Sequence, residues 1–284
     1  MLSLKDQLTV VYVIVADFLE KHPALDNWRK SNHAHPQFTD AEVMTIALMQ
    51  HYFRTPTLKQ TFLLVKANDP GAFPRCCSYQ QWIARLNRLI PQLGGMIQDI
   101  SQQADTGLPF YFLDSDPVPV CHPIRHARVR LLREDGAYFG KSSKGWFFGF
   151  KLHVVVNTEG LIVNAILTPG NWHDRDAATA LIQTLATGSV CLGDRIYHHA
   201  PLQDDIWESD GVVLLTRAEA GPAHQALLCS IRCRVETTFS QLWARFSSRL
   251  FSRSWAGLWT SLLLKILDHS LVTADLIPAF STQD

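Results

Sequence analysis

Two short apolar segments, each followed at once by an aspartate, constrain the fold of this chain most strongly. Phe110 to Leu113 precedes Asp114, and Val190 to Gly193 precedes Asp194. Short apolar runs without polar alternation are typical of strands that are buried on both faces of a sheet. The two segments therefore predict an α/β fold in which helices cover a central sheet.

The residues between and after these segments predict further strands. Trp146 to Val156 and Leu161 to Leu167 are expected to form a hairpin across the four-residue turn Asn157 to Gly160. Val212 to Leu215 is expected to form another strand. This order of elements predicts a mixed sheet in which a hairpin leads into parallel strands.

Capping residues and prolines set the expected ends of these elements. Pro117 and Pro119 are expected to stop regular strand pairing soon after the first aspartate, because proline lacks a backbone N–H. Asp174 is expected to cap a helix that runs through Leu185.

The first part of the chain, residues 1–105, is expected to form a small and mostly helical N-terminal domain. Thr39 and Glu42 have the spacing of a capping box, and Tyr79 to Ile90 is expected to form another helix. Gly107-Leu108-Pro109 marks a break before the second domain, residues 106–284. The helical domain is either a DNA-binding domain or a cap on the core, and no helix-turn-helix spacing separates the two.

A helix near the C-terminus carries a third acid. Val235, Phe239 and Leu242 recur at helical spacing, and Glu236 lies beside this apolar stripe. A carboxylate at the edge of a buried face requires a partner. That partner is either Arg232, one turn earlier, or a metal ion shared with other carboxylates.

Charge is balanced over the whole chain but is uneven along it. Lys plus Arg and Asp plus Glu are 26 each, so the formal net charge is zero. Two segments, Cys121 to Lys151 and Cys229 to Arg253, are nevertheless strongly basic. Basic segments that flank candidate carboxylates favour a polyanion brought to a metal site, with ordinary solvated surface as the alternative.

Cysteine usage and hydropathy predict a cytoplasmic protein. The six cysteines include no C-x-x-C pair, so we expect reduced thiols. No apolar run approaches the roughly 20 residues that span a bilayer. We therefore expect a cytoplasmic location, with association to the nucleoid when the protein binds DNA.

Asp114, Asp194 and Glu236 are the candidate metal ligands. Carboxylate oxygens suit Mg²⁺ or Mn²⁺, and a pair of such ions about 4 Å apart supports in-line phosphoryl displacement. Asp116 competes with Asp114 as the first acid, because residues two apart on a strand point the same way. Asp114 is preferred, since it directly ends the apolar strand.

The stretches that surround these three acids, together with two stretches between them, form a recognisable set of motifs. Five stretches occur in this order: Phe112-Leu113-Asp114-Ser115-Asp116-Pro117-Val118-Pro119-Val120-Cys121, Gly145-Trp146-Phe147-Phe148-Gly149-Phe150-Lys151-Leu152-His153, Thr168-Pro169-Gly170-Asn171, Leu192-Gly193-Asp194-Arg195-Ile196-Tyr197 and Arg234-Val235-Glu236-Thr237. Together they resemble the DDE transposases of bacterial insertion sequences, and among these insertion-sequence family nine-eight-two. The resemblance covers about residues 110–270 well and the first hundred residues loosely.

The resemblance implies a ribonuclease-H-like core that cleaves the ends of its own element and joins the freed 3′-hydroxyl to target DNA. It places the first, second and third catalytic acids at Asp114, Asp194 and Glu236, with two Mg²⁺ or Mn²⁺ ions as cofactors. The expected partners are the terminal inverted repeats, target DNA and a second copy of the chain, and no membrane. Seven candidates for nucleic-acid contacts are Arg125, Lys144, Lys151, His153, Arg195, Arg232 and Arg234.

One departure from the family pattern leaves alternatives open. The family usually has glycine after the basic residue that follows the second aspartate, and this chain has Ile196. If that glycine serves a positive φ or a close approach of DNA, isoleucine strains the loop. A related nuclease that cuts without joining, or a weakened DNA-binding remnant, are the alternative functions.

Overall fold

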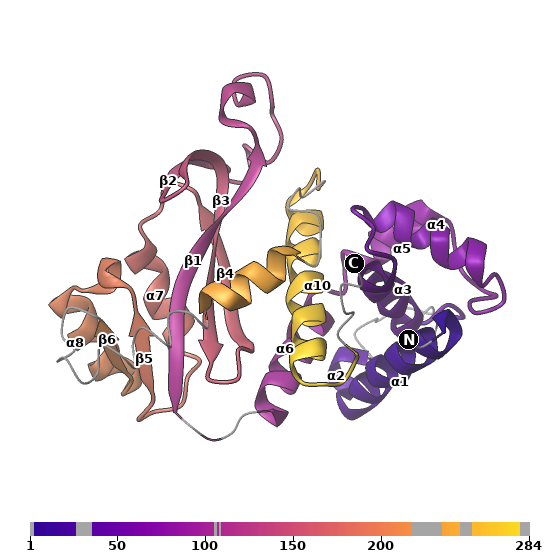
Figure 1. Ribbon diagram of the computed structural model, residues 1–284, viewed down its shortest axis with the longest axis horizontal. Helices are drawn as coiled ribbons and strands as arrows, with labels where there is room; N and C mark the ends of the chain where they lie inside the picture. The colour runs from indigo at the N-terminus through magenta and orange to yellow at the C-terminus, as the bar shows by residue number, and fades with distance from the viewer. Residues whose placement is uncertain are drawn as a thin grey trace. The chain divides into compact units, whose positions relative to one another are not determined.

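The structure is a computed structural model that describes residues 3–26, 36–104, 107, 109–216, 235–244 and 252–278 (Figure 1). The chain divides into two compact units, of which one combines Met1–Asp99 with Leu242–Asp284 and the other is Ile100–Gln241. The first unit is helical, and the second contains the sheet.

The helical unit begins with a series of short and medium helices. Their bounds are α1 (Leu4–Lys21), α2 (Pro23–Asp26), α3 (Asp40–Phe53), α4 (Leu58–Asn68), α5 (Tyr79–Leu86), α6 (Ile90–Gln103), whose last residues belong to the sheet unit, and α10 (Trp255–Thr273). The helix expected from Tyr79 to Ile90 is split into α5 and α6, because Pro91 lacks the N–H that a continuous helix would need there.

The predicted capping box at the start of α3 is confirmed. The Glu42 amide donates to Thr39 Oγ1 over 3.2 Å, and the Thr39 amide donates to Glu42 Oε2 over 2.5 Å. The core of this unit forms around Trp82, whose indole N–H donates to the Val43 carbonyl over 3.2 Å. The Trp82 ring lies 5.1 Å from the ring of Phe62 between centroids. Helices α3, α4 and α5 are therefore tied together through one buried indole.

The C-terminal helix α10 groups with these N-terminal helices, whereas the expected division placed residues 106–284 together. In α10 Leu262, Leu263, Leu264, Ile266 and Leu267 are all buried. A helix that is apolar on nearly every side is typically buried, and α10 contacts α3 of the same unit.

The described residues of the sheet unit form six strands in one mixed sheet. They are β1 (Phe110–Cys121), β2 (Tyr138–Ser142), β3 (Gly145–Asn157), β4 (Ile162–Pro169), β5 (Val190–Gly193) and β6 (Val213–Thr216). The strand order is β2-β3-β1-β5-β6, and β4 also pairs with β3. Residues 145–149 of β3 pair with β2 and residues 150–156 with β4, so these two strands follow one another along the same edge of β3.

Strand β3 runs antiparallel to β1, β2 and β4, and β5 and β6 run parallel to β1. Helices accompany the sheet: α7 (Asp174–Ile182), α8 (Ala200–Asp210) and a helix over residues 235–244. The predicted α/β class is confirmed, including the hairpin that leads into parallel strands. A mixed sheet flanked by helices and preceded by N-terminal helices is consistent with the ribonuclease-H-like fold.

The prediction that Pro117 and Pro119 stop strand pairing is wrong. Both prolines lie within β1 and are in register with Lys151 and Gly149 of β3. Strand β5 ends opposite Leu113, so the side of β1 away from β3 carries no paired strand beyond that point. Proline is tolerated on such an edge because no ladder hydrogen bond is lost there.

The first helix after the hairpin starts where it was expected but is capped by a different residue. Asp174 is the first residue of α7, and His173 is the N-cap, whose ring accepts from the Arg175 amide over 3.3 Å. The expected cap at Asp174 is therefore wrong by one residue. This leaves the Asp174 carboxylate available for another contact.

One core cluster lies between the sheet and α7. Tyr111 and Leu113 of β1, Val155 of β3 and Cys191 of β5 contribute to it, together with Ala177, Ala178, Leu181 and Ile182 of α7. Side chains alternate along a strand, so this cluster fixes which residues of β1 face α7.

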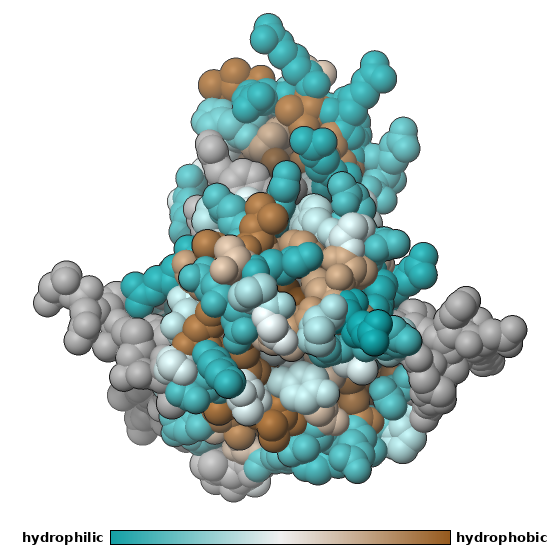
Figure 2. All heavy atoms as spheres, turned by 90° about the vertical axis from the view of Figure 1, so that its right-hand side faces the viewer, coloured by the Kyte–Doolittle hydropathy of each residue, from teal (hydrophilic) through white to brown (hydrophobic). Residues whose placement is uncertain are grey.

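The described helices include none that is long and apolar enough to cross a membrane. Figure 2 shows one face of the molecule, on which hydrophilic and hydrophobic residues are interspersed.

Candidate active site

The two strand-end aspartates leave neighbouring strands at the same level. Leu113 of β1 is paired in parallel with Gly193 of β5, and each is followed by an aspartate, Asp114 and Asp194. Asp194 keeps an extended backbone, with φ −68° and ψ 168°. Because adjacent strands lie about 4.8 Å apart, this register brings the two carboxylates to one edge of the sheet.

Asp114 and Asp116 lie on the face of the sheet opposite α7. Tyr111 and Leu113 point into the α7 cluster, so the alternation along β1 directs Asp114 and Asp116 to the other face. The sequence prediction that these two acids point the same way follows from the same alternation.

Asp114 and Asp116 form different polar contacts. The Ser115 amide donates to Asp114 Oδ1 over 2.8 Å. Asp116 Oδ1 lies 3.4 Å from the ammonium of Lys144, whose side chain is mostly exposed. The lysine partially neutralises Asp116, and Asp116 lies two residues farther from the paired end of β5. Both facts favour Asp114 as the acid that acts with Asp194.

Tyr197 is a buried aromatic residue three positions after the second aspartate. This residue ends the short 3₁₀ helix η2 (Arg195–Tyr197) and is 1% exposed. Burial raises the pKa of its hydroxyl well above 10, and the negative charges of Asp174, Asp114 and Asp194 raise it further.

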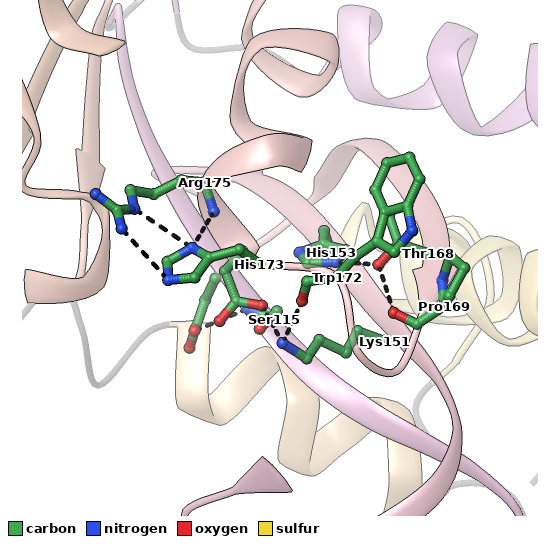
Figure 3. A network of polar contacts seen from close by, with 10 residues as sticks. Ser115, Lys151, His153, Thr168, Pro169, Trp172, His173 and Arg175 are labelled. Atoms are coloured by element: carbon green, nitrogen blue, oxygen red, sulfur yellow. Dashed lines mark hydrogen bonds and ion pairs between the residues drawn. The ribbon is translucent and has the colours of Figure 1, made fainter. Parts of the chain in front are cut away.

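Lys151 connects the sheet to the loop that precedes α7. Its ammonium lies 2.8 Å from Asp174 Oδ1 and donates to the Trp172 carbonyl over 2.8 Å (Figure 3). The side chains of Lys151 and Asp174 are only 13% and 12% exposed. The predicted contact of Lys151 with DNA therefore competes with a largely buried ion pair that anchors this loop.

His153 lies two residues farther along β3 and is fully buried. Its Nε2 shares a hydrogen bond of 2.8 Å with Thr168 Oγ1 on β4 (Figure 3). Burial lowers the pKa of the ring to about 4, although Asp174 opposes this shift. The ring is thus neutral near pH 7 and is covered by its neighbours, and a contact of His153 with DNA stays a prediction.

The loop before α7 presents exposed side chains beside this ion pair. Trp172 is 49% exposed, and His173 and Arg175 are in contact through their side chains, with Arg175 Nε donating to His173 Nδ1 over 3.3 Å. Figure 3 shows Lys151 and Trp172 together and His173 turned toward Arg175.

Glu236 lies on the helix over residues 235–244, as expected. Val235, Thr238, Phe239 and Leu242 form the buried stripe, and Glu236 beside them is exposed. Thr238 Oγ1 donates to the Gly160 carbonyl in the β3–β4 turn over 3.3 Å, which fixes the helix against the sheet unit.

Within the described residues, no three His, Cys, Asp or Glu side chains lie together closely enough to hold a metal ion. The structure thus brings Asp114 and Asp194 to one edge but does not complete a metal-binding group with Glu236. The donor set nevertheless fits a hard divalent cation, because carboxylate oxygens are the ligands that Mg²⁺ and Mn²⁺ prefer. Carboxylates also repel one another unless a cation lies between them.

An exposed basic surface follows β1. It consists of Arg125, Arg128, Arg130, Lys141 and Lys144. Among the described residues, only Lys144 of these five is paired with an acid, Asp116.

An aromatic residue adjoins this basic surface. Lys141 of β2 is in register with Trp146 of β3, and its ammonium lies 5.9 Å from the centroid of that ring. Trp146 is itself 64% exposed. Positive charge next to an exposed indole is a combination that suits nucleic acid.

The remaining predicted DNA contacts divide between the described and undescribed parts of the chain. Arg195 is exposed directly after Asp194, and its amide donates to Asp194 Oδ1 over 2.6 Å. Arg232 and Arg234 lie outside the described residues. Ile196, in η2, is 42% exposed and is not among the described residues with positive φ. Backbone strain at the glycine-to-isoleucine position is therefore excluded.

Sequence reasoning missed Tyr197 and the pairing of Lys151 with Asp174. Tyr197 ends the stretch Leu192 to Tyr197 that carries the family resemblance. Its position three residues after Asp194 was the only sequence feature that pointed to it. The pairing of Lys151 joins residues 23 positions apart, which no local pattern reveals.

Comparison with known proteins agrees with this geometry. Residues 104–243 match the model of the family described as the transposase DDE domain. The matched segment contains β1 to β6, both strand-end aspartates and Glu236. The match supports a DDE transposase and thus an enzyme of the transposase nuclease type. Searches among curated proteins and among solved structures found no match.

Proposed function

We propose that the protein is a DNA transposase of an insertion sequence, within insertion-sequence family nine-eight-two. It would hydrolyse a phosphodiester at each end of its element and transfer the freed 3′-hydroxyl to target DNA. The observation that carries this proposal is the parallel register of Leu113 with Gly193, which puts Asp114 and Asp194 side by side within the matched segment.

Asp114, Asp194 and Glu236 would hold two Mg²⁺ or Mn²⁺ ions. When bound, such ions activate a water or hydroxyl and stabilise the leaving oxygen of an in-line displacement. Glu236 is exposed on a helix that is fixed to the β3–β4 turn by Thr238, so its side chain is accessible to a shared ligand.

The other residues of the site would bind and orient the DNA. Arg125, Arg128, Arg130, Lys141 and Lys144 form an exposed cationic surface that suits phosphates. Lys144 links this surface to Asp116, two residues after Asp114 on β1. The basic surface would therefore lead a bound strand toward the acids.

Two copies of the chain would hold the two ends of one element in a homodimer. This follows from the proposed reaction, because each end requires its own set of acids. The helical unit remains either a DNA-binding domain or a cap. Both alternatives are open to the experiments described below.

The decisive experiment compares matched carboxylate substitutions on labelled duplex DNA that carries the inverted repeats flanking the coding region. We expect Asp114→Asn, Asp194→Asn and Glu236→Gln to abolish Mg²⁺- or Mn²⁺-dependent strand cleavage while DNA binding survives. Asp116→Asn is the control and should retain cleavage, since Asp116 is paired with Lys144.

Full cleavage by Glu236→Gln would remove the proposed triad. Capture of the cleaved ends by a target plasmid separates a transposase from a nuclease that cuts without joining. A wild-type protein that binds end DNA but never cleaves it would indicate a DNA-binding remnant instead.

A further inference from the structure

Trp146, at the start of β3, exposes most of a large aromatic side chain near the turn of the β2–β3 hairpin. The indole is 64% exposed, and the ammonium of its cross-strand neighbour Lys141 lies 5.9 Å from the ring centroid. Directly opposite residues of an antiparallel pair leave the same face of a sheet, so the ring and the cation belong to one surface. An exposed indole buries a large apolar area when another flat ring covers it. The pair therefore offers a stacking surface next to a positive charge.

A contact made by the hairpin turn places this surface near the candidate acids. The ammonium of Lys144, two residues before Trp146, lies 3.4 Å from Asp116 Oδ1. Asp116 is opposite Leu152 of β3. In a straight strand Gly145 and Leu152 would be about 23 Å apart, at about 3.3 Å per residue. One lysine side chain cannot cover that distance, so the hairpin curves back toward Asp116.

This curvature has a local cause in the pairing of β1 with β3. The register shifts between Pro119 and Cys121, where β1 has one residue more than β3. Such a bulge bends a strand and increases its twist. Gly149 of β3 is opposite Pro119, and a Cβ at this glycine would collide with the Val118 carbonyl oxygen. Glycine is therefore required where the two backbones approach each other at the bend.

The alternation of side chains along β3 puts the indole on the face of the sheet that carries Asp114 and Asp116. Val154 and Leu152 are directly opposite these two acids, and opposite residues share a face. Trp146 is an even number of residues from Leu152, so its side chain leaves β3 on that same face. The curvature and the alternation thus agree on the position of the stacking surface.

We propose that Trp146 and Lys141 hold the terminal base at a cut end of DNA, with the indole stacked on the base and the ammonium at a neighbouring phosphate. Inside a duplex each base is covered on both faces by its neighbours, whereas the last base at a cut end has one face uncovered. An aromatic side chain near the acids can stack on that face, whichever base it is. The inference deepens the proposed function and rests on it, because it assumes that strands are cut at these acids.

The test uses the full chain and two fluorescein-labelled duplexes that already end at the tip of the inverted repeat, so no cleavage is required. One duplex has a normal terminal base pair, and the other has abasic sites at that position in both strands. We expect the wild type to bind the normal end about tenfold more tightly in fluorescence anisotropy, a factor typical of one stacked base. Trp146→Ala should bind both ends alike, and Trp146→Phe, which keeps an aromatic ring, should retain part of the preference.

Three further measurements make the result specific. Trp207→Ala is the matched control and should keep the tenfold preference, since Trp207 is 57% exposed on α8 of the same unit. Lys141→Gln should weaken the binding of both ends by the same factor, because its ammonium acts on phosphate. The thermal midpoint of Trp146→Ala should equal that of the wild type, because the removed indole is mostly exposed.

Two results would overturn the stacking site. One is equal or absent binding of the two ends by the wild type, and the other is an unchanged preference in Trp146→Ala. Neither depends on whether the protein cleaves DNA. A preference that is lost in Trp146→Ala supports the stacking site even if the wild type cuts no DNA, an outcome that would overturn only the proposed function. Cleavage by a wild type that shows no preference would overturn only the stacking site.

Discussion

The ammonium of Lys151 on β3 and the carboxylate of Asp174 at the start of α7 form an ion pair at 2.8 Å, and both side chains are largely buried. The same ammonium donates to the Trp172 carbonyl, so one side chain secures the entire turn before α7. Figure 3 shows Ser115, the residue after Asp114, close to this ion pair.

Removal of one partner from this ion pair should destabilise the protein strongly. Lys151→Met leaves the Asp174 carboxylate buried without its cation, a change that typically costs about 3–5 kcal/mol. Chemical denaturation should show this loss as a lower free energy of unfolding. Lys144→Met is the control, because the exposed pair of Lys144 with Asp116 should contribute no more than about 1 kcal/mol. Equal effects of the two substitutions would contradict the assignment.

Neutralisation of the basic surface should weaken DNA binding in a salt-dependent way. Each lost phosphate contact reduces the slope of log affinity against log salt by about 0.9. The triple variant Arg125→Ala, Arg128→Ala and Arg130→Ala should therefore reduce the slope by about 2 to 3 in fluorescence anisotropy.

A matched variant tests whether the helical unit also contacts DNA phosphates. Lys59 and Lys66 are exposed on α4 of the helical unit, and their double alanine variant should leave the slope unchanged if that unit is a cap. A reduced slope in the α4 variant alone would instead place the phosphate contacts on the helical unit.

Buried His153 should make stability depend on acid pH. The pKa of His153 is about 4 in the folded protein and 6.5 when unperturbed. Between these two pH values the ring binds a proton in the unfolded chain but not in the native state. The contribution of His153 is fully present above pH 6.5 and is lost as pH falls toward 4. We expect the loss of this contribution to lower the free energy of unfolding by about 2 kcal/mol from pH 7 to pH 5.

Denaturation of the wild type and His153→Gln at both pH values checks this expectation. The variant should show a smaller drop between pH 7 and pH 5 than the wild type does. The same substitution at exposed His199 should leave the wild-type drop in place. An identical drop in all three proteins would mean that His153 titrates normally in the folded state.

The sequence alone predicts the parts of this structure that local chemistry determines. The strands before Asp114 and Asp194, the hairpin of β3 with β4, and the capping box of Thr39 with Glu42 all follow from apolar runs or cap spacing. Strand β2 was not predicted, because Tyr138–Ser142 is short and polar and is stabilised mainly by its pairing with β3.

Features that depend on distant parts of the chain could not be predicted from the local sequence. Pro117 and Pro119 continue β1 because β5 is too short to pair beside them, a fact of topology. Lys151 and His153 were candidates for contacts with nucleic acid, and the partners that bury them on the α7 side of β3 come from distant parts of the chain. The assembly of Glu236 with the two aspartates stays a prediction.

The pairing of Leu113 with Gly193 also restricts how the length of this chain can change during evolution. One residue inserted between Val190 and Asp194 would rotate the second carboxylate to the opposite face, because side chains alternate along a strand. An insertion in residues 122–137, between β1 and β2, leaves that alternation intact. A change of length is therefore compatible with residues 122–137 and incompatible with the four residues that lead to Asp194.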